Sequence, residues 1–199
     1  MATLTPMTSE PRLSKARDRL LRTASALFYA DGIRSVGVDR VIVEAGVTRA
    51  TFYRHFPGKE SLVVAYLEDV DRATRQHADD LASHNPDAAA WLRELTRSTG
   101  QRLCAPSFRG CPFINAAAEY PEPGSPVRRA VLAHREWLEG TVTEAFRRAG
   151  HPDPLSAGRH WVVLRDGAMV AAYLDDPDTA RGTLSSSVDT LLVACRVPS

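Results

Sequence analysis

The chain reads Ala45-Gly46-Val47-Thr48-Arg49-Ala50-Thr51-Phe52-Tyr53-Arg54-His55-Phe56 through a tight turn and the short helix expected after it. Thr48 can cap this helix, because its hydroxyl can accept a hydrogen bond from a backbone N–H near the helix start. The helix is then two-sided, with Val47, Phe52 and Phe56 toward a core and Arg49, Tyr53, Arg54 and His55 outward. A short helix packed on a small core, with basic and aromatic residues outside, suits a DNA major groove.

On both sides of this segment, apolar residues recur at the spacing of an amphipathic helix. Toward the N-terminus, one helix is expected over residues 14–31 and a second, shorter one over 37–45. Toward the C-terminus, Pro57-Gly58 ends the third helix, and a fourth runs from Lys59 to about Ser83. The remaining helices are expected at Asp87–Leu103, Pro112–Glu119, Pro126–Ala149, Leu155–Leu174 and Thr179–Cys195. No run alternates convincingly at period two, so the chain is predicted to be all-α with about nine helices.

Composition and charge divide the chain into an arm and two domains. Residues 1–13 mix Thr, Pro and Ser with little periodicity and are expected to form a disordered arm. Residues 1–60 carry ten Lys and Arg against six Asp and Glu, whereas residues 61–199 carry fifteen against eighteen. A basic N-terminal part is typical of a small nucleic-acid-binding module. The predicted domains are therefore residues 14–60 and 61–199, with the boundary inside the fourth helix.

Several classes of protein are not supported by the sequence. There is no apolar run of the length needed for a signal peptide or a membrane span, so a cytoplasmic protein without a membrane partner is expected. No catalytic or phosphate-binding motif is present, which argues against an enzyme, and no cofactor is predicted. The Cys and His residues lack metal-ligand spacing, and the cysteines at 104, 111 and 195 are expected to be free thiols.

The N-terminal third resembles the DNA-binding domain of the TetR/AcrR family of bacterial transcriptional repressors. The resemblance covers residues 20–67 and rests on Leu27-Phe28, Gly32, Val38, Val41, Ala45-Gly46-Val47-Thr48, Thr51-Phe52-Tyr53, His55-Phe56 and Lys59-Glu60-Ser61-Leu62. The segment Gly110–Glu119 is similar to the sixth-helix motif of the subgroup that includes LmrA/YxaF-like repressors. The rest of the chain matches the family in helix count and layout only.

The resemblance implies an architecture and a mechanism. Residues 14–60 would form a helix-turn-helix DNA-binding domain, and residues 61–199 a helical ligand-binding and dimerisation domain. The family forms homodimers through its last two long helices and holds a small-molecule effector inside the C-terminal domain. Effector entry tilts the fourth helix and separates the two recognition helices, which releases a palindromic double-stranded operator.

Position by position, the resemblance makes the third helix the recognition helix. The expected DNA-binding residues are Thr48, Arg49, Ala50, Thr51, Tyr53, Arg54, His55 and Lys59. Arg49 could bond a guanine bidentately or contact only phosphate. Ala50 stands where the family usually has Gly and could approach a thymine methyl. Tyr53 and His55 match phosphate-contacting positions but could also brace the small domain, and Lys59 should reach a phosphate.

Candidates for the effector pocket are large or polar residues on otherwise apolar helices. They are Trp91, Phe113, Asn115, Trp137, Trp161, Arg165, Met169 and Tyr173. An aromatic residue at helical spacing is more often part of a core, so each has a structural alternative. Asn115 and Arg165 are the most informative pair, because a buried amide or guanidinium needs a partner, from a ligand or from a neighbouring helix.

The two C-terminal helices are expected to form a four-helix dimer interface, with ordinary monomer core as the alternative. Gly167, Ala168, Ala171 and Ala172 would allow close helix packing there. Two alternatives to a ligand-responsive repressor stay open. One is a ligand-binding or interaction module without operator binding, and the other is a redox-responsive regulator acting through Cys104 and Cys111.

Overall fold

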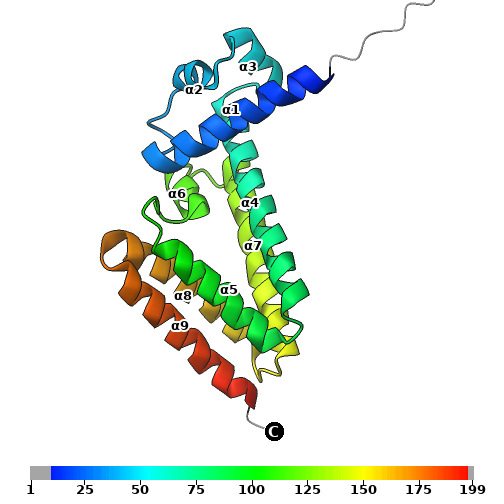
Figure 1. Ribbon diagram of the computed structural model, residues 1–199, viewed down its shortest axis with the longest axis vertical. Helices are drawn as coiled ribbons and strands as arrows, with labels where there is room; N and C mark the ends of the chain where they lie inside the picture. Colours follow the sequence, from blue (N-terminus) through cyan, green and yellow to red (C-terminus); the bar gives the residue numbers. More distant parts are fainter. Residues whose placement is uncertain (1–9, 197–199) are drawn as a thin grey trace, which may run out of the picture. The chain divides into compact units, whose positions relative to one another are not determined.

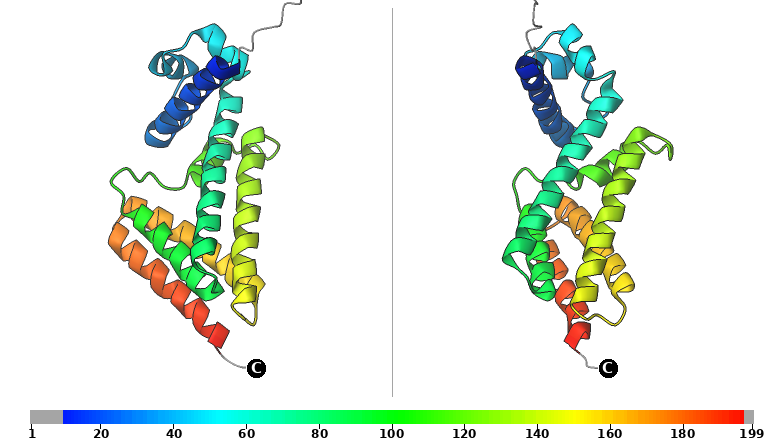
Figure 2. Two further views of the ribbon diagram at one scale, coloured as in Figure 1. Left: turned by 45° about the vertical axis from the view of Figure 1, so that its right-hand side comes forward. Right: turned by 90° about the vertical axis from the view of Figure 1, so that its right-hand side faces the viewer.

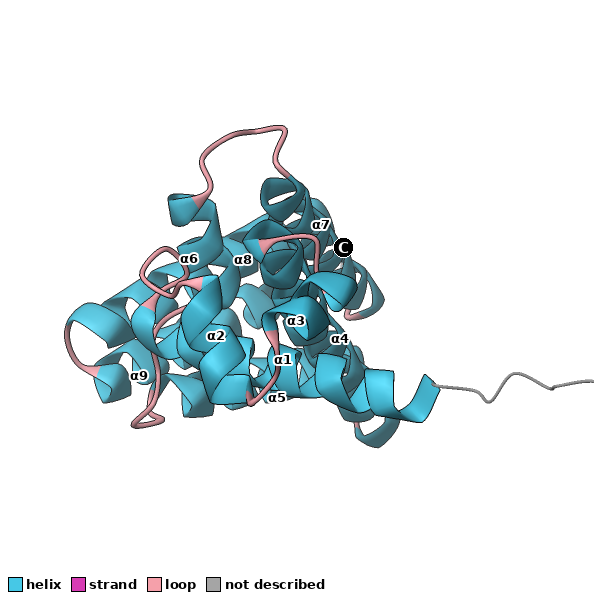
Figure 3. Cartoon of the chain, turned by 90° about the horizontal axis from the view of Figure 1, so that it is seen from above, coloured by secondary structure: helices cyan, strands magenta, loops and turns pink. Residues whose placement is uncertain are grey.

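The computed structural model describes residues 10–196, in which helices are joined by loops and no strand occurs (Figure 1; Figure 3). The helices are α1 (Glu10–Asp31), α2 (Val38–Ala45), α3 (Arg49–His55), α4 (Lys59–His84), α5 (Ala88–Leu103), α6 (Pro112–Glu119), α7 (Pro126–Arg148), α8 (Pro154–Leu174) and α9 (Pro177–Val193). A 3-10 turn, Ala194–Arg196, follows α9. The all-α fold expected from the periodicity is confirmed.

The first helix begins earlier than the sequence indicated. Helix α1 starts at Glu10 instead of Ser14, so residues 10–13 are helical and do not belong to an arm. Pro11 is compatible with this start, because the first turn of a helix needs no backbone N–H donor. Residues 1–9 of the expected arm lie outside the described residues.

The chain forms two compact units, and their boundary lies within α4. Unit 1 extends to Tyr66 and unit 2 begins at Leu67, whereas the sequence placed the boundary at residue 60. The first turns of α4 belong to unit 1 because Leu62 and Val63 are fully buried there. The Tyr66 ring packs edge-on against Phe28 of α1, with centroids 5.9 Å apart.

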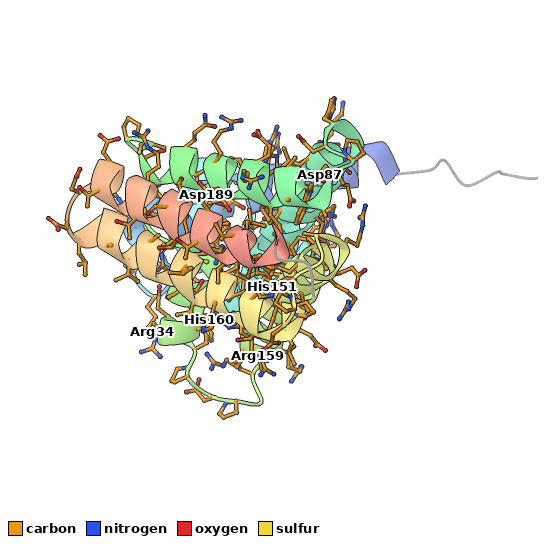
Figure 4. The ribbon with its side chains drawn as sticks, turned by 90° about the horizontal axis from the view of Figure 1, so that it is seen from below. Arg34, Asp87, His151, Arg159, His160 and Asp189 are labelled. Atoms are coloured by element: carbon orange, nitrogen blue, oxygen red, sulfur yellow. The ribbon has the colours of Figure 1, made fainter. Side chains whose placement is uncertain are left out.

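In unit 2, α9 runs antiparallel to both α5 and α8, whereas α4 and α7 run in the same direction (Figure 2). Helices α5, α8 and α9 pack closely on one another, and α7 packs against α5, α6 and α8. An ion pair between Arg93 of α5 and Asp189 of α9 spans 3.0 Å at the edge of this group, and Figure 4 shows Asp189 on the side of α9 that faces α5. Trp161 of α8 is buried and donates from Nε1 to Thr96 Oγ1 of α5 at 3.0 Å.

One glycine sets how closely α7 and α8 approach. Gly158 of α8 is buried against Thr143 of α7. A Cβ at this position would lie 3.1 Å from the Thr143 Cα and would overlap the Thr143 Oγ1. The two backbones therefore meet at a point where no side chain fits, which is the kind of close approach that selects glycine.

Side-chain caps set the starts of the later helices. Asp87 caps α5 and Ser125 caps α7, each by accepting a hydrogen bond from a backbone N–H. Helix α9 begins at Pro177, not at the predicted Thr179, because the Asp176 carboxylate accepts from the backbone N–H groups of Asp178 and Thr179. Within the described part of the chain, no helix has the length and apolar character needed to cross a membrane.

Candidate functional site

The turn between α2 and α3 is fixed by local backbone chemistry. Gly46 adopts φ 61° and ψ 42°, a left-handed conformation that favours glycine. The N–H of Val47 donates to the carbonyl of Ile42 at 3.2 Å, which closes the end of α2. Thr48 then caps α3, with its Oγ1 accepting from the Thr51 N–H at 3.1 Å. The helix-turn-helix geometry is thus encoded within a few residues.

The inner face of α3 is anchored by two phenylalanines. Phe52 and Phe56 are buried, and their ring centroids lie 6.0 Å apart. The Arg17 guanidinium of α1 lies 5.3 Å from the Phe56 ring centroid, in a cation–π arrangement. Val47, also expected in the core, is only half-buried. Because Phe52 and Phe56 hold the helix from inside, the direction of its outer side chains is fixed.

The outer face of α3 brings together most of the predicted DNA-binding residues. Thr48, Arg49, Ala50, Tyr53 and Arg54 are exposed, whereas Thr51 and His55 are half-buried. Tyr53 is 49% exposed, and its ring rests edge-on against Phe52 at 5.2 Å between centroids. The Thr51 hydroxyl is hydrogen-bonded to that of Thr48 at 2.9 Å. Thr51 therefore takes part in the N-terminal cap of α3. The side chains available to a ligand are mainly those of the exposed residues of this face.

Arg49 has a partner that the sequence analysis missed. Its guanidinium forms an ion pair with the carboxylate of Asp39 in the first turn of α2, and both side chains are largely exposed. An exposed ion pair contributes about 0–1 kcal/mol, whereas a bidentate arginine–guanine contact is worth about 1–3 kcal/mol. The ion pair is therefore weak, and base contact by Arg49 stays a prediction.

His55 and Lys59 have structural surroundings in addition to their predicted roles. The pKa of His55 is lowered by burial and by the nearby Arg54 and Arg17, so its imidazole is neutral at pH 7. Burial favours the bracing role for His55 over an electrostatic phosphate contact. The ammonium of Lys59 donates to the Arg34 carbonyl at 3.3 Å, which fixes the loop before α2 to the start of α4. A phosphate contact by Lys59 stays a prediction.

Unit 2 contains an open cavity of about 570 Å³ between α4, α5 and α7. Two of the predicted pocket residues, Trp91 and Trp137, line it, together with Asp79, Glu136 and Arg148. The Trp91 Nε1 donates to the Ala78 carbonyl at 3.1 Å. Trp137 carries the Arg75 guanidinium over its ring, 4.4 Å from the centroid.

A second cavity, of about 200 Å³, lies between α6, α7 and α8. Phe113 and Arg165, both predicted pocket residues, line it with Cys111 and His134. His134 was missed by the sequence analysis because it falls on the apolar stripe of α7 and reads as core. The fold brings Asp71 of α4 within hydrogen-bond distance of His134, and only this contact shows that His134 belongs to a polar cluster.

Four predicted pocket residues line neither of these cavities. Trp161 and Met169 are buried core residues of α8, and Trp161 contacts α5 through Thr96. Asn115 donates from Nδ2 to the Arg109 carbonyl at 2.8 Å and so stabilises the loop before α6. Tyr173 is 57% exposed on α8. The partner that Arg165 was expected to need is Asp166, at 2.8 Å.

His134 stands at the centre of a buried network. Its ring is 4% exposed, stacks on Phe113 at 3.6 Å between centroids, and its Nδ1 lies 2.6 Å from Asp71 Oδ1. Burial opposes the Asp71 charge, but hydrogen bonds from Arg75 and His134 outweigh this and lower the pKa of the carboxyl. Burial also lowers the pKa of His134 despite Asp71. The neutral ring therefore donates from Nδ1, and its Nε2 has no hydrogen-bond partner among the described residues.

This network makes the stability of unit 2 depend on pH. Between the lowered pKa of folded His134 and its ordinary value near 6.5, the unfolded chain binds a proton at His134 that the folded chain does not, so stability falls as pH falls through this range. His134 changes the free energy of unfolding by at most about 1.4 kcal/mol per pH unit. We expect His134→Asn, whose amide can replace Nδ1 toward Asp71, to reduce the slope between pH 7 and pH 5 in urea unfolding followed by tryptophan fluorescence. The same substitution at the exposed His160 should leave it unchanged, and equal slopes in all three proteins would contradict the assignment.

The cysteines have separate surroundings. Cys104 Sγ lies 3.7 Å from Asp178 Oδ1 of α9, whereas Cys111 Sγ lies 3.7 Å from the Arg165 guanidinium of α8. All three cysteines are free thiols. These contacts do not favour a disulfide switch between Cys104 and Cys111. Among the described residues there is also no cluster of His, Cys, Asp and Glu that could hold a metal ion.

The chain matches known proteins over most of its length. Residues 20–66 match the family model of bacterial regulatory proteins, tetR family. The HTH-type transcriptional regulator LmrA of Bacillus subtilis is 30% identical over 89% of this chain and 96% of its own. The crystal structure of SCO4454, a TetR-family transcriptional regulator from Streptomyces coelicolor, is 49% identical, covers 92% of this chain and 97% of its own, and superimposes with a TM-score of 0.89.

Proposed function

Because the chain belongs to the TetR family of bacterial transcriptional regulators, we propose that it is a ligand-responsive repressor that binds a palindromic operator as a homodimer. The observation that carries the proposal is the outer face of α3, on which Arg49, Tyr53 and Arg54 are exposed while Phe52 anchors the helix. The relatives are transcriptional regulators, and this chain offers the same helix-turn-helix to a DNA groove.

The dimer is supported by an apolar stripe on α8. Val163, Val170 and Leu174 are exposed, the last by 75%, and they recur at helical spacing. Gly167 lies between them, and a Cβ built there would have no atom within 4 Å. Large apolar residues exposed in a row are typical of protein–protein interfaces, which supports the proposed dimer. Figure 4 shows that α9 runs beside α8, and its exposed residues include Val193.

The response to a ligand is supported by the two cavities and by α4. This helix is unbroken from Lys59 to His84. Its first turns belong to the helix-turn-helix unit, while Ala78, Asp79 and Ala82 form part of the wall of the larger cavity. A ligand that displaced this wall would act on a helix shared with the DNA-binding unit. We infer that operator release is transmitted along α4.

The experiment is a selection from a randomised duplex pool, with wild type and a Val170→Arg, Leu174→Arg double variant. Wild type should sediment as a dimer and enrich a palindrome. The double variant should sediment as a monomer and lose the palindrome, because dimerisation would bury four arginines without acidic partners in the symmetric interface. Val43→Arg, which places a charge on an exposed valine of unit 1, should sediment like wild type.

The outcomes separate the alternatives. A dimeric wild type that enriches no sequence would indicate a ligand-binding module without operator binding. A double variant that remains dimeric would show that the dimer does not use the α8 stripe. Enrichment should fall steeply with salt, because phosphate contacts release counterions.

A further inference from the structure

The 200 Å³ cavity between α6, α7 and α8 has an unbalanced charge. Three arginines line it, Arg128, Arg135 and Arg165, and no carboxylate does. Asp166 lies nearby and pairs with two of them, with Arg135 at 2.6 Å and with Arg165 at 2.8 Å. Arg128 forms no ion pair with the described residues. One carboxylate against three guanidiniums leaves the cavity positive.

Helix α6 adds to this positive potential. Its first turn, from Cys111 through Phe113 to Ile114, lines the same cavity. The cap residue Cys111 makes no side-chain hydrogen bond to the backbone N–H groups of this turn. The start of a helix leaves such groups without intrahelical partners and carries a partial positive charge, which favours anions.

A buried polar group in the cavity wall also lacks a partner. His134 is 4% exposed, its Nδ1 is used by Asp71, and its Nε2 has no hydrogen-bond partner among the described residues. Buried polar atoms are nearly always hydrogen-bonded in folded proteins, so an unpaired one in a cavity wall points to a missing ligand. Because the neutral ring donates from Nδ1, its Nε2 is an acceptor. It therefore marks the cavity as a ligand site, whereas the arginines determine the preference for an anion. On its other side, His134 contacts α4 through Asp71, whose carboxylate also accepts from Arg75 at 2.6 Å.

The remaining wall is apolar. Phe113, Ile114, Ala117, Val131 and Leu138 contribute to it. The volume equals that of about seven water molecules at ~30 Å³ each. A ligand of this size with a charged end and an apolar body would satisfy both parts of the wall.

We propose that this cavity binds a small organic carboxylate, with its anionic group held by Arg165 and the first turn of α6 and its apolar body against Phe113. This proposal deepens the proposed function, on which its regulatory part rests, by naming the chemical class of an effector. His134 connects the site to α4, because a ligand that contacts its ring acts on the same imidazole that is bonded to Asp71.

The test compares acids with their uncharged amides on the full-length protein. Acetate, butyrate and benzoate are each titrated against acetamide, butyramide and benzamide, by calorimetry and by thermal stabilisation. At least one acid should bind at least tenfold more tightly than its amide. If no acid binds more tightly than its amide, the proposal is overturned, and this comparison needs only wild-type protein.

Two variants locate the site. Arg165→Met keeps much of the side-chain volume, and Asp166 retains Arg135 as a partner. Arg165→Met should lower the affinity for the preferred acid at least tenfold and change the affinity for its amide little. Circular dichroism checks that the variant has the native fold. Arg148→Met, at the larger cavity, should leave the affinity for the acid unchanged. Loss of acid binding in Arg148→Met but not in Arg165→Met would place the anion elsewhere and overturn the assignment.

The regulatory part is measured separately, on a duplex from the selection. Release of the duplex by the preferred acid, lost in Arg165→Met, supports an effector site. If the acid binds but does not release the duplex, the cavity is an acid-binding site and its role as an effector site is overturned. Acid binding by a protein that selects no duplex would instead contradict the repressor function and leave the anion site standing.

Discussion

Arg49→Ala is expected to weaken binding to the selected operator by roughly 30-fold to 10⁴-fold. A bidentate arginine–guanine contact supplies about 1–3 kcal/mol of discrimination, and a symmetric dimer makes it twice. The structure supports this reading because Arg49 is exposed at the start of α3 and its partner, Asp39, is exposed as well. Fluorescence anisotropy on the operator, and on duplexes with one symmetric base pair changed, measures the effect.

The pattern of the loss matters more than its size. If Arg49 reads a base, the variant should lose its preference at one symmetric position and bind the altered duplexes almost as well as wild type does. Lys59→Ala, which is predicted to remove a phosphate contact, should instead weaken all duplexes uniformly and reduce the salt slope. Asp39→Asn should bind at least as tightly as wild type, because it removes a competing carboxylate. An equal loss on every duplex in Arg49→Ala would mean that Arg49 contacts only phosphate.

Gly158→Ala is expected to destabilise unit 2 by about 3 kcal/mol. The new Cβ would overlap the Thr143 Oγ1 and lie 3.1 Å from the Thr143 Cα, so the backbones of α7 and α8 would have to separate. Overpacking of this kind typically costs about 1–3 kcal/mol, and a contact with backbone leaves little room for relaxation. Urea unfolding followed by tryptophan fluorescence reports on unit 2 alone, because all three tryptophans lie there.

Two further variants control for this clash. Gly140→Ala, on α7 with no atom within 4 Å of the added methyl, should be stabilising by about 0.5–1 kcal/mol. Thr143→Ala combined with Gly158→Ala removes the overlapping hydroxyl and should recover part of the loss, with a coupling above about 0.5 kcal/mol. A Gly158→Ala protein within about 0.5 kcal/mol of wild type would show that the helices can adjust.

The fold could be predicted because its signals are local. Gly46 and Thr48 determine the turn and the cap within a few residues, and the apolar spacing of each helix is visible in the sequence. The exposed positions of α3 followed from the same spacing. The start of α9 was predicted two residues too late, because the sequence pattern did not identify Asp176 as its cap.

The cavities could be predicted only in part, because they depend on contacts between distant segments. Helical spacing cannot separate Trp91 and Trp137, which line a cavity, from Trp161, which is core. His134 looked like an ordinary core position until the fold brought Asp71 against it. The Arg49–Asp39 ion pair likewise depends on the angle between α2 and α3, which no spacing rule supplies.

The unbroken α4 also limits how such a protein can be recombined. The boundary between the units falls between Tyr66 and Leu67, inside a continuous helix and not in a flexible linker. One residue inserted there would turn everything beyond it by about 100° around the helix axis and shift it by about 1.5 Å. A chimera that exchanges sensor halves must therefore preserve helical phase at the junction, so the exchange of modules is constrained by screw symmetry and not by linker length.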